Sequence, residues 1–232
     1  MFESKYSKAL TVILIIIIIA IVSLLGLLGY DLYQKHFIEK EAMAFTESFE
    51  QEIENTTTSE DVTSDKDENV TDEEITNPLD KIENITTESN TTTSQTAAKP
   101  TYKGFGVLGK MSIPAINFEY PILEKVTKKS IETSVAYLYG VGVNQVGNTV
   151  IIGHNYRNGL FFSNNKKLNV GDKIYITDNA GNKLTYTIYN KFETTPDDIS
   201  FYQRDTNGRP EITLSTCTDD SSARLIIFAR TE

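Results

Sequence analysis

Cys217, His154 and Arg224 are the side chains whose types could carry out covalent chemistry in this sequence. Cys217 is the only cysteine of the chain, and a cysteine thiolate is a strong nucleophile that a nearby cation favours. The imidazole of His154 can protonate a leaving amine. The guanidinium of Arg224 can stabilise a developing oxyanion. Together the three side chains suit acyl transfer through a thioester.

The same residues also fit a purely structural interpretation. A lone cysteine is more often a small buried side chain than a nucleophile. His154 would then be a histidine at the rim of the fold with ordinary hydrogen bonds. Metal binding is disfavoured, since one cysteine and one histidine fall short of the usual four ligands and no C-x-x-C or H-x-x-x-H spacing exists. We therefore predict no metal site.

The segment around Cys217 predicts two strands joined by a short turn. Residues 212–217 alternate apolar and small polar side chains, the period-2 pattern of a strand. Residues 225–228 are a second apolar run of strand length, and the polar residues 218–223 between them form a turn. If the two strands pair as neighbours, Arg224 lies within reach of the sulfur.

Residues 100–232 predict one mostly β domain with short helices. Residues 149–152 are a buried strand that leads into His154. Residues 173–177 and 184–189 flank turn-forming residues and predict a hairpin. Some eight short strands with few helices predict an antiparallel sheet that closes into an eight-stranded β-barrel.

The N-terminus predicts a membrane anchor. Residues 1–8 contain Lys5 and Lys8, and residues 9–30 carry no charge. A helix of that length spans about 33 Å, enough for a bilayer core of about 30 Å. The run exceeds the apolar region of a cleaved signal peptide, which is the alternative. The lysines before the span predict a cytoplasmic N-terminus with the rest of the chain outside.

Two segments separate this anchor from the domain. Residues 31–54 place apolar residues on one face of a helix and predict a short solvated juxtamembrane stalk; the alternatives are that they continue the membrane helix or pack on a partner. Residues 55–99 are rich in Thr, Ser, Asn and acidic residues, which predicts a disordered spacer that holds the domain away from the bilayer. Residues 31–99 carry 18 acidic and 5 basic residues, a net charge of −13, so the acidity of the chain, whose net charge is −10, lies in this segment. The nearly neutral domain gives no sign of nucleic-acid binding.

Several segments of the domain resemble the sortase family. They are TLSTC at 213–217, the arginine seven positions later, GHN at 153–155 and IPAINFEYPI at 113–122. The resemblance covers about residues 104–231. The motifs are specific as a set, although each one alone is weak.

The resemblance implies a single-pass cysteine transpeptidase on the surface of a Gram-positive-type bacterium. Such enzymes cleave an LPxTG-like sorting signal between Thr and Gly, and pass the acyl group to an amine of a cell-wall precursor or a pilin. By motif, Cys217 is the nucleophile, His154 the general acid and base, and Arg224 the oxyanion-stabilising or substrate-positioning residue. We predict that Thr216, Asn155 and Ser215 bind the substrate.

The subclass stays open. GHNYRNGLFF and TLSTC resemble class B sortases, yet only about 20 residues separate Asp197 from Cys217, where class B enzymes carry a long helical insertion. Some sortases bind calcium through acidic loop residues, but no such site can be placed here, so no cofactor is predicted. Two alternatives remain: a surface cysteine hydrolase that transfers to water, and a non-catalytic tethered binding module.

Overall fold

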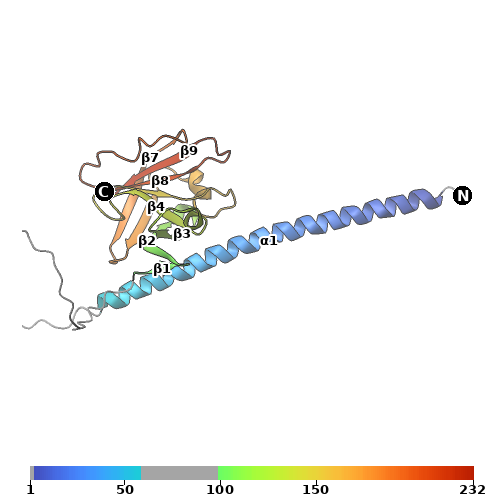
Figure 1. The fold of residues 1–232 in the computed structure, drawn as a ribbon, viewed down its shortest axis with the longest axis horizontal. Coiled ribbons are helices and arrows are strands. Elements are labelled where there is room, and N and C mark those ends of the chain that lie inside the picture. Colours follow the sequence, from blue (N-terminus) through green and yellow to red (C-terminus); the bar gives the residue numbers. More distant parts are fainter. Residues whose placement is uncertain (1–2, 59–98) are drawn as a thin grey trace, which may run out of the picture.

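A long helix precedes the domain. The computed structural model of the protein describes residues 3–58 and 99–232, with side chains for 10–55 and 99–232. Helix α1 (Glu3–Thr58) runs through both the predicted anchor and the predicted stalk, and takes in the first residues of the predicted spacer. The disorder predicted for the rest of that spacer lies outside the described residues. Figure 1 shows the domain beside the C-terminal half of α1.

The described part of the domain forms a closed barrel. Strands β2 to β9 follow the order β2-β3-β4-β5-β8-β9-β7-β6, and β6 pairs back onto β2. The predicted eight-stranded barrel is confirmed, with the two-residue β1 added as an arm on β2. The strands are β1 (Thr101–Tyr102), β2 (Phe105–Ile113), β3 (Phe118–Leu123), β4 (Val135–Gly140), β5 (Gly147–Ile152), β6 (Lys173–Asp178), β7 (Lys183–Thr194), β8 (Pro210–Cys217) and β9 (Arg224–Arg230).

The sheet is mixed, so the prediction of an antiparallel sheet is wrong. β3 pairs with β4, and β5 with β8, in parallel. Parallel neighbours need a crossover connection, and the short helix α2 (Lys128–Ile131) lies in the crossover between β3 and β4. Two 3₁₀ turns, η1 (Pro114–Ile116) and η2 (Phe162–Lys167), complete the short helices.

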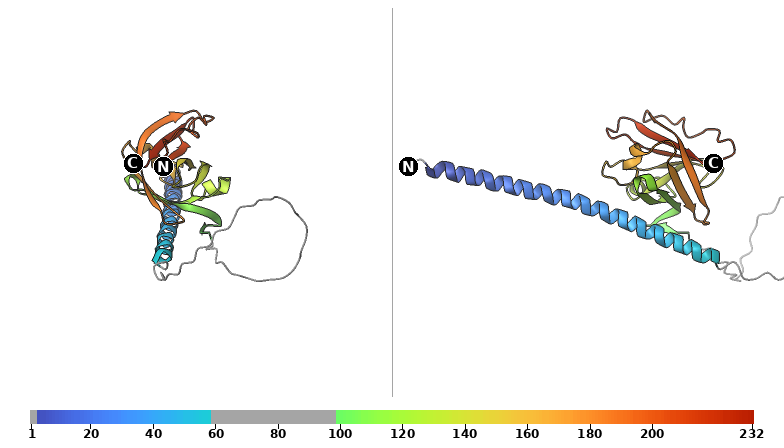
Figure 2. Two further views of the ribbon diagram at one scale, coloured as in Figure 1. Left: turned by 90° about the vertical axis from the view of Figure 1, so that its left-hand side faces the viewer. Right: turned by 180° about the vertical axis from the view of Figure 1, so that it is seen from behind.

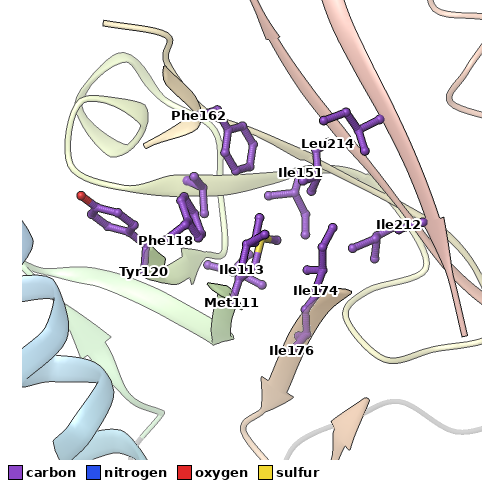
Figure 3. Packing of buried hydrophobic residues seen from close by; sticks show 14 of the residues in the cluster. Met111, Ile113, Phe118, Tyr120, Ile151, Phe162, Ile174, Ile176, Ile212 and Leu214 are labelled. Atoms are coloured by element: carbon purple, nitrogen blue, oxygen red, sulfur yellow. The ribbon is translucent and has the colours of Figure 1, made fainter. Parts of the chain in front are cut away.

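The barrel interior is filled by one apolar cluster (Figure 3). On β8, Ile212 and Leu214 are fully buried in this cluster. Because side chains alternate across a strand, Thr213, Ser215 and Cys217 project from the opposite, outer face. Members shown in Figure 3 include Met111, Ile113, Phe118, Tyr120, Ile151, Phe162, Ile174 and Ile176.

The C-terminal half of α1 packs on the barrel, so the prediction of a solvated stalk is wrong. Ala42 is fully buried in the barrel cluster, and Phe49 is buried in a second cluster with Tyr102. The rings of Phe45 and Tyr102 pack in a tilted arrangement with centroids 5.0 Å apart. The helical face that the sequence pattern marked as apolar is therefore covered by the chain's own barrel.

Two ion pairs flank this apolar contact. Lys103 pairs with Glu41 at 2.6 Å, and the buried Lys110 pairs with Glu50 at 2.6 Å. Lys110 also contacts Glu119 on β3 at 3.1 Å. Because the Lys110 side chain is only 7% exposed, its charge depends on these carboxylates for compensation.

In the first half of α1, the apolar side chains that the structure describes lie uncovered. Those between Leu10 and Leu32 are exposed. Among the described helices, α1 alone is long and apolar enough to cross a membrane, a criterion that a signal sequence near the N-terminus also meets.

The packing of α1 predicts a stability cost for truncating Phe49. In the chain of residues 34–232, Phe49→Ala should lower the free energy of unfolding by about 3 kcal/mol, because it empties a buried site. Denaturant unfolding measures this difference. Glu47→Ala on the exposed face of the same helix is the matched control and should stay within about 0.5 kcal/mol. Equal stability of the two variants would contradict the packing.

Candidate active site

The register of three adjacent strands aligns the three candidate residues. β8 lies between β5 and β9 in the barrel. Gly147 pairs with Pro210 and Ile152 with Ser215, so continuing the parallel register by two residues sets His154 beside Cys217. On the other side, Cys217 pairs directly with Arg224 in the antiparallel register. Residues paired in this way share one face of a sheet, so the three form a row across the strand ends.

Arg224 contacts the thiol directly. Its Nη1 donates a hydrogen bond to Cys217 Sγ over 2.9 Å. The turn between the two strands is closed by backbone bonds, including one from the Thr218 N–H to the Ala223 carbonyl at 3.0 Å. Its polar residues therefore form the tight connection that the sequence predicted, and the guanidinium lies at the sulfur.

Gly153 fixes the strand end that carries His154. Its N–H donates to the Ser215 carbonyl at 3.3 Å, and its carbonyl accepts from the Thr216 hydroxyl at 2.7 Å. A Cβ at this position would lie 2.8 Å from Val135 and 2.9 Å from Phe162. Only glycine fits between these buried side chains, which explains why a glycine precedes His154.

Asn155 ties the other side of His154 to the cysteine strand. Its Nδ2 donates to the Cys217 carbonyl at 3.0 Å and to Asp219 Oδ1 at 2.9 Å. Lys166 bonds the second oxygen of Asp219 at 2.5 Å. The Lys166 ammonium and the Asn155 amide lower the pKa of the Asp219 carboxyl. Both residues that flank His154 are therefore hydrogen-bonded to the segment that carries Cys217.

An aromatic stack supports the imidazole. The ring of His154 stacks on Tyr156 with centroids 4.8 Å apart, and Tyr156 packs on the buried Phe161 at 5.8 Å. Partial burial lowers the pKa of His154, and the carboxylate of Glu132 opposes this shift. Phe161 holds a positive φ of 50°, a conformation unusual for a bulky residue, at the end of the loop of residues 155–161 that follows His154.

The three residues predicted to bind substrate occupy different environments. Thr216 is 4% exposed and its hydroxyl bonds Gly153, so its side chain ties two strands together and does not face a ligand. Ser215 lies on the same outer face as Cys217 but is largely buried. Asn155 is half-buried beside the cysteine carbonyl. The structure thus brings Asn155 and Ser215 to the site and turns the Thr216 side chain away.

The connection from β7 to β8 covers the outer face on which Cys217 lies. Arg204 donates to Thr213 Oγ1 at 2.6 Å and pairs with the buried Glu211 at 2.9 Å, while its guanidinium lies 3.9 Å from the Phe228 ring centre. Asn148 donates to the Tyr202 carbonyl at 2.9 Å. The Phe201 side chain is buried in one cluster with Val150 and Ile226. These contacts hold the β7–β8 connection in place as a wall over β5, β8 and β9.

A cleft of about 850 Å³ lies at the far end of that wall. It is lined by residues that include Tyr139, Asn148, Tyr202 and Gln203. Asn148 is six residues before His154, which corresponds to about 20 Å along an extended strand. The cleft is therefore remote from the thiol, at the opposite end of the same sheet face.

Sequence reasoning missed Lys166, Asp219, Tyr156, Glu132 and Arg204. Asp219 follows Cys217 by two positions, and Tyr156 follows His154 by two, so proximity in the sequence was an available signal for these two. Nothing in the sequence distinguishes the other three from ordinary surface charges. Lys166 and Glu132 act on residues more than 20 positions away, and Arg204 meets Glu211 and Thr213 through the folding of an irregular loop. Among the described residues, no group of three or more His, Cys, Asp or Glu side chains could hold a metal ion.

Comparisons of the chain with known proteins all point to the same family. A model of the sortase domain matches residues 111–232, more than half of the chain. Sortase A of Bacillus anthracis is 36% identical over 124 residues, which are 52% of this chain and 58% of that protein. The chain thus spans less than two thirds of the length of this curated relative.

Solved structures give the same result. Sortase A from Corynebacterium diphtheriae superposes with a TM-score of 0.51 at 29% identity, over 55% of this chain and 61% of that one. A Clostridium perfringens sortase D5 transpeptidase superposes with a TM-score of 0.50 at 27% identity, over 55% of this chain and 79% of that one. The fold and the sequence motifs therefore point to one family.

The environment of His154 predicts the effect of removing the nearby carboxylate. Because Glu132 raises the pKa of His154 against the effect of burial, Glu132→Gln should lower that pKa further. The imidazole should then be less protonated at any given pH near its pKa. The proton chemical shifts of the two histidines measure this, with the exposed His36 as an internal reference. Glu47→Gln is the control, and an unchanged or higher pKa in Glu132→Gln would contradict the assignment.

Proposed function

Because the chain belongs to the sortase family, we propose that it is a cysteine transpeptidase with Cys217 as nucleophile, His154 as general acid and base, and Arg224 as oxyanion donor. The observation that carries the proposal is the position of the thiol. Cys217 is bonded to the Arg224 guanidinium and lies beside the strand end of His154. A nucleophile flanked by a cation and a proton donor is the minimum set for acyl transfer through a thioester.

The first half-reaction forms the thioester. The Cys217 thiolate attacks the scissile carbonyl, and the electron pair of the C=O bond moves to oxygen. Arg224 donates to this oxyanion, since its guanidinium already reaches the sulfur. When the tetrahedral intermediate collapses, the C–N bond breaks and His154 gives its proton to the leaving amine.

The second half-reaction transfers the acyl group. The acceptor amine attacks the thioester carbonyl and loses a proton to the now neutral His154. The C–S bond breaks and the thiolate returns, so atoms and charges balance over one cycle. Water in place of the amine would give hydrolysis, and the aromatic stack on His154 supports one imidazole position for either acceptor.

An LPxTG-like sorting signal of surface proteins is the proposed substrate. Four residues on the acyl side span about 13 Å when extended, and a bound signal would run from Cys217 along the side of the wall, since the wall covers the outer face of β8 itself. The half-buried Ile152 and the wall from Tyr202 supply apolar surface there. The acceptor would be an amine of a cell-wall precursor or a pilin.

The apolar half of α1 supports a single-pass membrane anchor with the N-terminus in the cytoplasm. Its side chains are exposed, and burying them in lipid would remove a large apolar surface from water. We place the barrel on the outer face of a Gram-positive-type cell membrane. The protein would then join surface proteins to the cell wall or to pili.

A ligation assay tests the function. The purified chain is incubated with an LPxTG-type peptide, with and without triglycine. A peptide joined to triglycine is the expected product. Cleavage to the free acid in both reactions would instead make the protein a hydrolase, and the absence of any turnover would favour a binding module.

Substitutions test the assigned residues in the same assay. Cys217→Ala should abolish turnover, and His154→Ala and Arg224→Ala should each reduce kcat/KM by several orders of magnitude, because each removes a group that acts in the transition state. Lys167→Ala, an exposed residue of η2, is the control and should retain full activity. Turnover by Cys217→Ala would remove the nucleophile assignment.

A further inference from the structure

The barrel is docked on α1 in one defined direction. The histidine loop, residues 155–161, lies against the early part of the docked helix, where a Cβ on Gly159 would come within 2.6 Å of Lys35 Nζ. The β6–β7 hairpin lies against the late part, where a Cβ on Gly181 would come within 2.6 Å of the Ile53 side chain. Figures 1 and 2 show the barrel alongside this half of α1, with the N-terminal half projecting beyond it.

Contacts along α1 between Lys35 and Ile53 fix the orientation of the barrel on the helix. The Glu41–Lys103 and Glu50–Lys110 ion pairs lie on either side of the Phe45–Tyr102 ring contact. Ala42 is fully buried in the barrel cluster. A helix held by buried apolar side chains and paired charges along several turns cannot rotate freely against the barrel.

The rise per residue of an α-helix gives the height of each contact above the membrane. The uncharged run ends at residue 30, and Lys35 follows five residues later, about 8 Å along the axis. Ile53 lies 18 residues beyond Lys35, about 27 Å further out. A polar headgroup layer extends about 6 Å beyond each side of the hydrocarbon core. The contact at Gly159 is therefore near the headgroups, and the contact at Gly181 is far from them.

The active site belongs to the membrane-near edge. His154 immediately precedes the histidine loop, and Lys166, which follows that loop, bonds Asp219 in the turn after Cys217. We propose that docking on α1 turns the catalytic edge of the barrel toward the bilayer, so that the site takes peptide segments held close to the membrane surface. This rests on the proposed membrane anchor, and its consequence for substrates rests on the proposed transpeptidase activity.

Docking of the barrel on α1 would leave residues 55–99 without the spacer role predicted from their composition. A spacer would hold the domain away from the bilayer, but a barrel seated on residues 35–53 of α1 takes its height from the helix. The chain leaves the helix at Thr58 and returns at Lys99, whose ammonium bonds Glu124 at 2.6 Å. The length of the segment between these points therefore does not set the height of the active site.

Energy transfer to the membrane tests the orientation without any need for activity. The full chain carrying Cys217→Ala is placed in nanodiscs with an acceptor dye on the lipid headgroups. A donor dye is attached either at Arg157→Cys in the histidine loop or at Ala180→Cys in the hairpin, both exposed positions. We expect clearly higher transfer from position 157. Equal transfer from both positions, or higher transfer from position 180, would overturn the orientation.

A matched pair of substitutions tests whether the docking causes the difference. Ala42→Glu places a carboxylate in the buried contact and should bring the transfer from the two positions close together. Ala44→Glu makes the same change on the exposed face of the helix and should preserve the difference. If Ala42→Glu left the difference intact, the helix contact would not set the orientation. Failure of the full chain to insert into nanodiscs would contradict the proposed membrane anchor.

The consequence for substrates is measured with a sorting peptide attached to lipid through a short or a long linker. The wild-type chain and Ala44→Glu should turn over the short-linker substrate several-fold faster, and Ala42→Glu should lose this preference. A preference for the long linker would contradict the proposed height. Absence of turnover of the soluble peptide would instead count against the proposed function, and the energy-transfer result would stand apart from it.

Discussion

The central constraint of the structure is the pairing of β8 with a parallel neighbour on one side and an antiparallel neighbour on the other. The parallel register with β5 sets the histidine strand end beside Cys217, and the antiparallel register with β9 sets Arg224 opposite it. A one-residue slip in either register would turn the paired side chain to the opposite face. The buried residues Ile212 and Leu214 resist such a slip, because it would expose them. Core packing thus positions the chemical groups.

The barrel also depends on a helix that lies outside its sheet. Ala42 and Phe49 complete apolar clusters that would otherwise face water. Within the barrel, Tyr120 packs on Phe161, and Phe161 contacts Tyr156. The Tyr156 ring in turn stacks on His154. A continuous set of aromatic contacts therefore runs from the barrel core to the imidazole. Lys35 of α1 lies against the same loop at Gly159. The segment that leaves the membrane and the segment that holds the histidine are neighbours.

Local patterns predicted the strands around Cys217, the turn before Arg224 and the closed barrel, because alternation and turn residues depend only on nearby sequence. The parallel pairing of β5 with β8 was not predictable, since those strands are joined through β6 and β7 and no short pattern records their register. The face of α1 was recognised as apolar, but its partner was not, because Tyr102 and Val107 lie more than 40 residues away. A similar separation, 53 residues, hid Lys166 as a partner of Asp219. Arg204 and Glu211 are only seven residues apart, but the loop conformation that brings them together left no pattern in the sequence.

The most direct test of the central claim is to trap the acyl-enzyme. Brief incubation of the chain with an LPxTG-type peptide, acid quenching and peptide mapping by mass spectrometry locate any covalent adduct. The account predicts the LPxT acyl group on the peptide that contains Cys217, together with release of the glycine-bearing fragment. Cleavage of the substrate with no adduct at Cys217, or with an adduct on a different residue, would contradict it.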